Sequence, residues 1–136
     1  MTTPVDYEIH GAVALIALNN PPVNAMGIAV RNGIMEAVDK AEADEDIKCI
    51  VLTGRNRCFC GGADITEFGK PRQEPSLSVI INRIEASTKP VVVAIHNTAV
   101  GGGCEISLGC HYRVGDASAR FGLPEIKLGL LPGAGG

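Results

Sequence analysis

Apolar runs and polar turns alternate along the chain, and the apolar runs predict β-strands in three places. Residues 7–18 predict a β-hairpin that turns near His10-Gly11. Two further runs, residues 47–53 and 91–95, are rich in Val and Ile and have the length of buried strands. Residues 19–24 are Asn- and Pro-rich, so we expect them to end the hairpin.

Two segments repeat apolar residues at a spacing of three or four, which is typical of amphipathic helices. The first covers residues 28–43, with apolar positions Val30, Ile34, Val38 and Ala41. We expect its opposite, polar face to contain Arg31, Glu36 and Asp39. The second contains Leu77, Ile80, Ile81 and Ile84, and it ends before Lys89-Pro90.

The remaining pattern predicts short strands at residues 112–114 and 119–121, followed by a loop at residues 123–126. Strands that alternate with helices predict an α/β layer fold built from crossover units. In such sheets, ligands bind beyond the carboxyl ends of the strands. The chain is long enough for one domain, which we expect to cover residues 1–136.

Composition argues against several classes of function. Apolar residues make up 46% of the chain and the net charge is −3, so the chain is expected to fold. Its basic residues are scattered, which argues against a nucleic-acid partner. The apolar runs are too short to span a bilayer, and the first residues lack the basic flank and apolar core of a secretory signal. We therefore expect neither a nucleic-acid nor a membrane partner.

The cysteines and histidines do not form a recognisable site. Five cysteines in a chain without a secretory signal are expected to be reduced, and none forms a CxxC pair. The three histidines lack ligand spacing, so we expect no metal site. Cys104 has no histidine near it in sequence that could activate it as a nucleophile, so we expect it to be a small buried residue. His96 lies at the end of a strand, and we expect it to be a polar residue with its hydrogen bonds satisfied rather than a catalytic base.

The stretch 100–110 carries the strongest indication of chemistry. Three consecutive glycines, Gly101 to Gly103, follow the strand at residues 91–95 and precede Glu105. If a helix begins within the triplet, its first N–H groups have no intrahelical acceptor and offer the positive end of the helix dipole to a ligand. An amide donor beside a carboxylate predicts an oxyanion site with an acid or base. A tight turn followed by a solvated glutamate is the alternative.

A second glycine pair, Gly61-Gly62, follows the strand at residues 47–53 in the same way. Both loops are expected at one edge of the sheet, where they could supply two amide donors to one oxygen. The glycine spacing matches neither a phosphate-binding P-loop nor a dinucleotide-binding fingerprint.

Three segments, in order along the chain, resemble a known family. They are FCGGADI (residues 59–65), KPVVVAIHNTAVGGGCEISLGC (residues 89–110) and FGLPEIKLGLLPGAGG (residues 121–136). Together they resemble the enoyl-CoA hydratase/isomerase (crotonase) family. Residues 21–25 and 109–113 look most like the hydratase segment of multifunctional fatty-acid β-oxidation enzymes of the peroxisomal type.

The resemblance implies a crotonase-like spiral of ββα repeats and a set of site residues. Ala63 and Gly102 would supply the oxyanion N–H groups, and Glu105 and Glu125 would be the catalytic carboxylates. The implied substrate-binding residues are Gly61, Asp64, Ile65, Gly101 and Gly133. The two glutamates together favour hydration of trans-2-enoyl-CoA to 3-hydroxyacyl-CoA, with Glu105 acting on water and Glu125 on the α-proton. The CoA thioester is the substrate, and no separate cofactor is expected.

The chain departs from the family pattern in two respects. The family often has a lysine just before residues 23–25 and another just after Ile65, both near the CoA phosphates; this chain has Pro22 and Thr66-Glu67 there. The candidates to replace them are Arg55, Arg57, Lys70 and Arg72. The family also continues past GAGG into helices that cover the acyl pocket, so we expect a C-terminally incomplete domain.

Three functions remain open from the sequence. The first is an enoyl-CoA hydratase. The second is a Δ3-Δ2-enoyl-CoA isomerase or another crotonase-type CoA-thioester enzyme, and the third is an inactive fragment that retains only the fold. The expected partner is an acyl-CoA, and the parent protein would be a homo-oligomer or be fused to a 3-hydroxyacyl-CoA dehydrogenase part. The expected location is intracellular, in the peroxisome or the cytoplasm.

Overall fold

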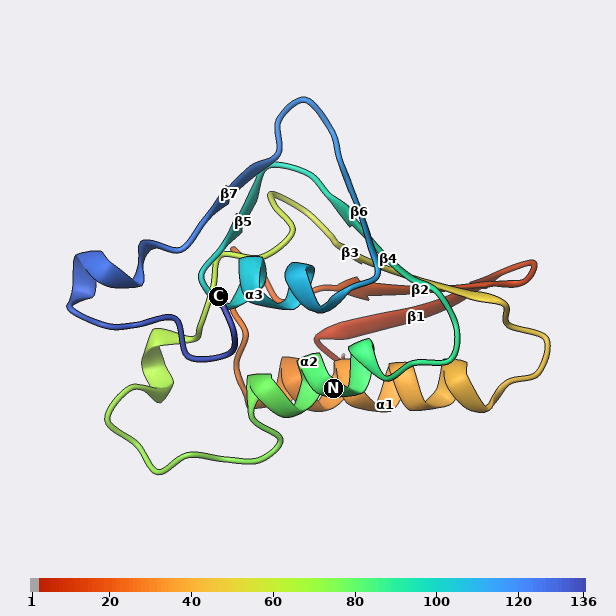
Figure 1. Cartoon of the computed structure of the whole chain (residues 1–136), viewed down its shortest axis with the longest axis horizontal. Coiled ribbons are helices and arrows are strands. Elements are labelled where there is room, and N and C mark those ends of the chain that lie inside the picture. The colour runs from red at the N-terminus through yellow and green to blue at the C-terminus, as the bar shows by residue number, and fades with distance from the viewer. Residues whose placement is uncertain (1–2) are drawn as a thin grey trace.

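The computed structural model describes residues 3–136, which form a main sheet, a smaller sheet and three α-helices (Figure 1). The main sheet has five strands in the order β1-β2-β3-β4-β6. These are β1 (Val5–His10), β2 (Val13–Leu18), β3 (Cys49–Gly54), β4 (Val91–Ile95) and β6 (Tyr112–Gly115). β1 and β2 form the predicted antiparallel hairpin, whereas each later neighbouring pair is parallel.

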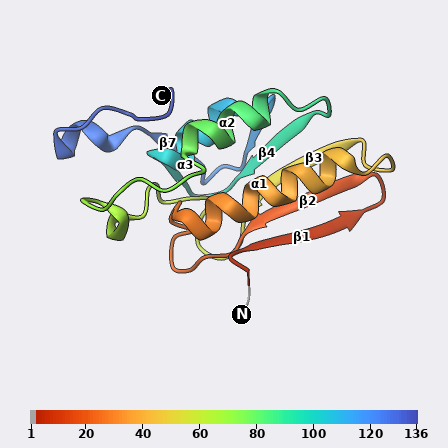
Figure 2. The ribbon, with the colours of Figure 1, turned by 90° about the horizontal axis from the view of Figure 1, so that it is seen from below.

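Helices α1 (Ile28–Ala43) and α2 (Leu77–Glu85) cover one face of the main sheet, as Figures 1 and 2 show from two directions. The predicted apolar stripe of α1 is buried in one core with the inward-facing residues of β2, β3 and β4. Burying a large aliphatic side chain contributes about 1.5–3 kcal/mol. This core therefore holds the two helices against the sheet and leaves the loops at the strand ends to build a site.

The chain repeats a strand–strand–helix unit that winds it into a spiral. β4 lies in the main sheet, the next strand β5 (Thr98–Val100) leaves it, and α3 (Gly102–Gly109) follows. The next turn repeats this order with β6, β7 (Arg120–Gly122) and the 3₁₀ helix η2 (Pro124–Leu128). β5 and β7 pair in parallel as a separate sheet. The predicted spiral of ββα repeats is confirmed.

Local differences from the predicted elements lie close to the cleft described below. The sequence did not predict β5, which is only three residues long. Residues 123–126 were expected as a loop, but most of them belong to η2. A further 3₁₀ helix, η1 (Ile65–Glu67), follows the first glycine pair. The prediction that Arg31 lies on the polar face of α1 is wrong, because Arg31 is buried.

Within residues 3–136, no helix is both long and apolar enough to cross a bilayer. The same part of the chain contains no group of three or more His, Cys, Asp or Glu side chains that could hold a metal ion. The five cysteines are free thiols.

Candidate active site

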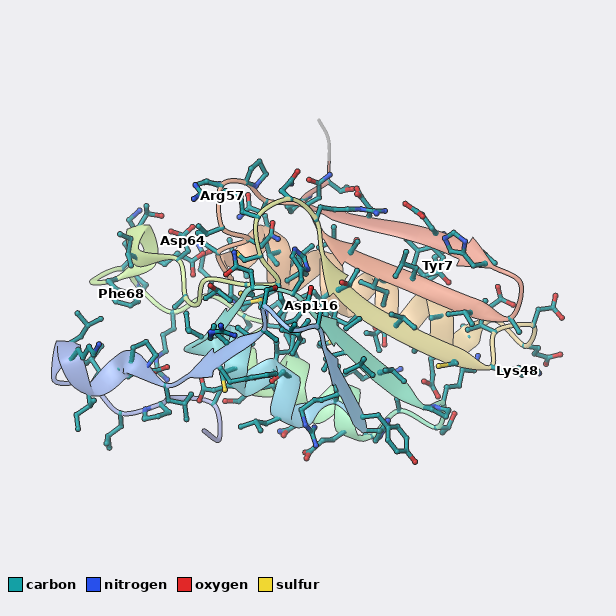
Figure 3. The ribbon with its side chains drawn as sticks, turned by 90° about the horizontal axis from the view of Figure 1, so that it is seen from above. Tyr7, Lys48, Arg57, Asp64, Phe68 and Asp116 are labelled. Atoms are coloured by element: carbon teal, nitrogen blue, oxygen red, sulfur yellow. The ribbon has the colours of Figure 1, made fainter. Side chains whose placement is uncertain are left out.

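A cleft of about 1350 Å³ lies between residues 61–78, the start of α3 and the C-terminal segment. Figure 3 shows Asp64 and Phe68, from one wall of this cleft, at the opposite end of the molecule from Tyr7 and Lys48. Every site residue singled out from the sequence lines the cleft: Gly61, Ala63, Asp64, Ile65, Gly101, Gly102, Glu105, Glu125 and Gly133. The fold therefore brings these residues together from four separate segments.

Helix α3 begins within the glycine triplet, which meets the condition set out for an amide donor there. Gly101 is its N-cap, and the first helical hydrogen bond runs from the Glu105 N–H to the Gly101 carbonyl (3.0 Å). The Gly101 N–H donates outside the helix, to the Gly122 carbonyl of β7 (2.9 Å). The Gly102 N–H has no acceptor within residues 3–136. An unpaired N–H at the positive end of a helix can receive a ligand oxygen.

The glycines of the triplet are needed for two reasons, a left-handed backbone conformation and close packing. Gly101 has φ +53°, a left-handed conformation that side chains rarely adopt. A Cβ on Gly102 would lie 2.9 Å from Leu77 Cδ2, and a Cβ on Gly103 would lie 2.7 Å from both Cβ and the carbonyl oxygen of Cys60. The triplet thus lets the start of α3 approach α2 and the loop that contains Cys60.

The loop with the first glycine pair presents a second unpaired amide to the same place. A Cβ on Gly102 would lie only 3.8 Å from the Ala63 nitrogen. The Ala63 N–H also lacks an acceptor in the described part of the chain. Gly62, with φ +105°, packs against the Val100 carbonyl, to which an added Cβ would approach within 3.2 Å. Two free donors from two spiral turns therefore lie close together, which is the arrangement that stabilises an oxyanion.

Glu105 extends from the first turn of α3, with only 4% of its surface exposed. Its Oε1 atom accepts hydrogen bonds from the N–H groups of Ala134 (2.7 Å) and Gly136 (3.1 Å). This oxygen therefore holds the segment that contains Gly133 against the cleft. The Oε2 atom makes no hydrogen bond within residues 3–136, which leaves it available to a ligand.

Glu125 approaches the cleft from η2. Its Oε2 atom is buried and has no hydrogen-bond partner within residues 3–136. Its Oε1 atom lies 3.2 Å from the position of a Cβ built on Gly101. A buried carboxylate oxygen without a partner is costly in a folded protein, and such oxygens occur at sites that bind a proton, water or a substrate.

The thiol of Cys104 lies near both carboxylates, and its pKa is raised. Burial is the main cause of its raised pKa; the Gly122 N–H opposes the rise, and the nearby charges of Glu105 and Glu125 add to it. A thiol with a raised pKa remains protonated and unreactive. The prediction that Cys104 is a small buried residue is confirmed.

Asp64 and Ile65 belong to a further wall of the cleft, which continues through residues 66–78. The Asp64 carboxylate accepts from the Thr66 N–H (2.9 Å) and hydroxyl (2.8 Å), which begins η1 and lowers the Asp64 pKa. Ile65 is 73% exposed and so offers an apolar surface at the mouth of the cleft. The Gly61 N–H is already bonded to the Val23 carbonyl (2.8 Å), so Gly61 can contact a ligand only with its Cα and carbonyl.

The structure separates the basic residues that were candidates to meet CoA phosphates. Arg55 lies outside the cleft, where its guanidinium pairs with Asp6 and Glu8 of β1. Arg57 does not line the cleft, whereas Lys70 and Arg72 do. His96 also lies outside the cleft, and its Nε2 donates to the Asn56 carbonyl (3.2 Å), so it is a polar residue with a hydrogen-bond partner, as expected.

Two polar residues near the cleft were missed by reasoning from the sequence. The Arg31 guanidinium donates to the Met26 and Pro75 carbonyls and forms an ion pair with Glu67 (2.9 Å). Glu67 also accepts from the Ile28 N–H (2.6 Å) at the start of α1. This connection fixes one wall of the cleft to α1. The second missed residue, Asn24, is buried beneath the loop of Ala63.

A smaller hollow of about 530 Å³ lies apart from this cleft, at the C-terminal end of α1, and includes Lys48, Thr88 and Lys89. Its polar groups are already bonded to protein: Lys89 Nζ donates to the Ala41 and Asp44 carbonyls, and Thr88 bonds to Glu42. It therefore offers no comparable set of free donors and carboxylates.

Comparison with known proteins relates the chain to a described family. Residues 8–136 match the family profile described as enoyl-CoA hydratase/isomerase. The chain is 51% identical over 131 residues to the peroxisomal bifunctional enzyme of Danio rerio, covering 96% of this chain and 18% of that protein. It is 43% identical over 132 residues to a peroxisomal fatty acid beta-oxidation multifunctional protein of Oryza sativa, covering 91% of this chain and 18% of that protein.

Solved structures agree with this match. An enoyl-CoA hydratase from Bacillus anthracis aligns with a TM-score of 0.88 at 28% identity, covering 96% of this chain and 54% of that chain. One from Thermoplasma volcanium aligns with a TM-score of 0.85 at 29% identity, covering 95% of this chain and 54% of that chain. The chain thus spans about a fifth of the multifunctional relatives and about half of these solved proteins.

Proposed function

Because the chain belongs to the enoyl-CoA hydratase/isomerase family, we propose that its cleft catalyses the hydration of trans-2-enoyl-CoA to 3-hydroxyacyl-CoA. One observation supports this most: two amide groups without acceptors, those of Ala63 and Gly102, lie close together in a cleft that also contains two carboxylates. This combination of groups can supply what the addition of water to an enoyl thioester requires, which is stabilisation of negative charge on the thioester oxygen and two proton transfers.

The two amides act on the thioester oxygen. When water attacks the β-carbon, negative charge moves through the conjugated system to that oxygen. Two fixed N–H donors stabilise this charge without having to reorganise, and one such donor is typically worth about 10²–10³ in rate. The helix dipole of α3 adds to the effect, because the Gly102 N–H belongs to its first turn.

The two carboxylates divide the proton transfers. Glu105, ionised, accepts a proton from water as the hydroxyl oxygen bonds to the β-carbon. Glu125, protonated, gives a proton to the α-carbon as the enolate returns to the thioester. The free Oε2 atoms support these roles, since Oε1 of Glu105 is occupied by Ala134 and Gly136. Solvent exchange restores both groups, so water is consumed and no cofactor is needed.

The remaining parts of the cleft accommodate the rest of the substrate. Lys70 and Arg72 are proposed to meet the CoA phosphates, because they line the cleft and take part in no ion pair within residues 3–136. Asp64, Ile65 and Gly133 are proposed as further substrate contacts. CoA enters as part of the substrate rather than as a bound cofactor.

We propose that the described residues form a single crotonase-like domain of a peroxisomal protein. The peroxisomal relatives support this location, and the cytoplasm is the alternative. Because those relatives are multifunctional, fusion to a 3-hydroxyacyl-CoA dehydrogenase part is proposed for the parent protein, with a homo-oligomer as the alternative.

The test is an assay of the purified chain with matched thioesters of short acyl length. Loss of the conjugated absorbance of a 2-enoyl-CoA measures hydration, and its appearance from a 3-enoyl-CoA measures isomerisation. We expect hydration, and we expect His96→Gln to retain it because His96 lies outside the cleft. Isomerisation alone would replace the proposal with an isomerase. Binding without either reaction would show that this chain retains only the fold and CoA binding.

A further inference from the structure

Asn24 lies directly beneath the loop that carries the Ala63 amide. Its side chain is 1% exposed and does not line the cleft, so it cannot touch a substrate. Its backbone has φ +53°, a conformation that asparagine adopts more readily than other non-glycine residues. A fully buried polar residue in an uncommon conformation requires a compensating set of contacts.

Those contacts are made with one loop. The Asn24 Nδ2 atom donates to the carbonyls of Arg55 (3.0 Å), Cys58 (2.9 Å) and Phe59 (3.2 Å). The Asn24 Oδ1 atom accepts from the Asn20 N–H (2.9 Å), which fixes the orientation of the amide. The two N–H groups of the side chain are thereby shared among three carbonyls of the turn that follows β3.

The backbone around Asn24 continues the attachment as far as Ala63. The Cys60 thiol lies 3.1 Å from the Asn24 carbonyl, and the Gly61 N–H donates to the Val23 carbonyl (2.8 Å). The Met26 N–H then donates to the Gly62 carbonyl (2.8 Å), immediately before Ala63. Residues 23–26 and 58–63 thus form a continuous set of contacts that ends at the Ala63 amide.

We propose that Asn24 is a positioning residue that aims the Ala63 N–H at the thioester oxygen. The proposal rests on the proposed function, in which Ala63 supplies one of the two oxyanion donors. Such a donor is effective only if it is already fixed in place, and supporting hydrogen bonds provide that rigidity. Aspartate has nearly the same shape but would set an acceptor against three carbonyls, so the amide group itself is required.

The informative variant is Asn24→Gly, because glycine accepts the positive φ and the change removes only the side chain. A matched control is Asn97→Gly. Asn97 has φ +55° and donates to the Arg57 carbonyl (2.9 Å) of the same turn. It is exposed, and its acceptor precedes Ala63 by six residues. We expect Asn24→Gly to lower kcat by about 10- to 100-fold, since a small misplacement of a catalytic group has an effect of this size. KM should change by less than kcat.

A spectroscopic measurement separates positioning from general stability. The probe is 3-ketobutyryl-CoA, which cannot be hydrated and whose enolate absorbs in the near-ultraviolet. At saturation, the ratio of bound enolate to keto form measures how well the two donors stabilise charge on the oxygen. We expect Asn24→Gly to lower this ratio at least tenfold and Asn97→Gly to preserve it. An unchanged ratio in folded Asn24→Gly would overturn the proposal.

Hydrogen exchange provides a readout that needs no ligand. We expect Asn24→Gly to accelerate exchange of the Gly61 and Met26 amides, while the Gly101 amide, bonded to β7, stays protected. If the wild-type chain does not favour the enolate of the probe, the proposed function fails. Unchanged exchange in the variant would separately refute the positioning role. If Asn24→Gly does not fold, Asn24→Ser, which keeps one donor, replaces it in both measurements. We then expect a smaller fall in the enolate-to-keto ratio and a smaller acceleration of exchange. If neither quantity changed in Asn24→Ser, the proposal would be overturned.

Discussion

Two walls of the cleft are built in opposite ways. The inner wall, residues 58–63 and 101–105, is mostly buried and is tied to its neighbours by backbone hydrogen bonds. The outer wall, residues 124–136, exposes large apolar side chains, including Ile126 (80%) and Leu131 (88%). Its far end is held by the two hydrogen bonds to Glu105.

This difference assigns different tasks to the walls. The inner wall carries both proposed oxyanion donors, for which preorganisation is essential, because a donor that must move into place loses its advantage. The outer wall carries Glu125 and Gly133, and in the proposed reaction this wall would have to admit substrate and release product. Each wall contributes one carboxylate, so the proposed reaction depends on both. The predictions below test this division, from the largest expected effect to the smallest.

The strongest test is to remove proton transfer from each wall in turn. Glu105→Gln and Glu125→Gln keep the size of the side chain but lose its proton-transfer function, so each should lower hydration of a short 2-enoyl-CoA by about 10²–10⁴. The double variant should lose much less than the product of the two, because groups that act as a unit are not additive. A single variant with most of the wild-type rate would refute the paired mechanism.

Gly102→Val changes only the inner wall. The side chain would clash with Leu77 and crowd the space beside the Ala63 nitrogen, so the thioester oxygen should be displaced from its donors. We expect turnover to fall by about 10²–10³, the effect of losing one oxyanion donor. Gly122→Ala, in β7, is the comparison, because an added Cβ there would make only an ordinary van der Waals contact with Val100 (3.7 Å). Unchanged turnover in Gly102→Val would exclude Gly102 from the oxyanion site.

The attachment of the outer wall to the inner one can be broken at Glu105. Glu105→Ala removes the acceptor for Ala134 and Gly136, whereas Glu105→Gln retains an oxygen there. A hydrogen bond to a charged group contributes about 1.5–3 kcal/mol, so exchange of these two amides should accelerate about 10- to 100-fold in the alanine variant. Equal exchange in Glu105→Ala and wild type would show that the outer wall is held by other contacts.

The buried thiol of Cys60 makes the inner wall sensitive to alkaline pH. Burial raises the Cys60 pKa to about 12, against an ordinary value of 9.0. The protonated thiol therefore contributes stability that is complete below about pH 9 and is lost as the pH rises towards 12, with a slope approaching about 1.4 kcal/mol per pH unit. Denaturant unfolding at several alkaline pH values should show a shallower decline in Cys60→Ala. The same decline in both proteins would contradict this contribution.

The smallest expected effect on stability is at the exposed end of the outer wall. Leu131→Ser should change the free energy of unfolding by no more than about 0.5 kcal/mol, because the side chain is already in solvent. It should reduce association measured by light scattering, since exposed apolar patches favour contacts between molecules.

We expect the unmodified chain to associate or to unfold readily. A monomeric, cooperative transition above about 60 °C would contradict that expectation.

Features that depend on neighbouring residues were predictable from the sequence. The helices, the hairpin and the glycine triplet follow from local spacing, and the triplet indicated that a helix begins there with Glu105 one turn inside. The grouping of Glu125 and Gly133 with these residues came from family resemblance, because no local pattern relates η2 to α3. The structure places all of these side chains in one cleft.

Features that depend on distant partners were not predictable. The acceptors of Asn24 follow it by 31–35 residues, and a turn-forming Asn two residues after Pro22 gives no sign of burial. The apolar periodicity of α1 placed Arg31 on the polar side of the helix, so it was expected to face solvent. Its burial depends on an ion pair with Glu67, which lies 36 residues further along the chain and could not be foreseen from local spacing. β5 has only three residues, too few for a periodic pattern.

The parallel pairing of β5 with β7 has a consequence for how the length of the chain can vary between related proteins. Val100 is in register with Gly122, and each of the two strands leads within a few residues to one of the carboxylates. An insertion at the exposed tip formed by residues 116–118 leaves that register intact, because a surface loop can lengthen at little cost. A single residue added between Gly122 and Glu125 would instead turn the second carboxylate away from the first. Insertions and deletions should therefore gather at that tip and be absent from the short segments on either side of the paired strands.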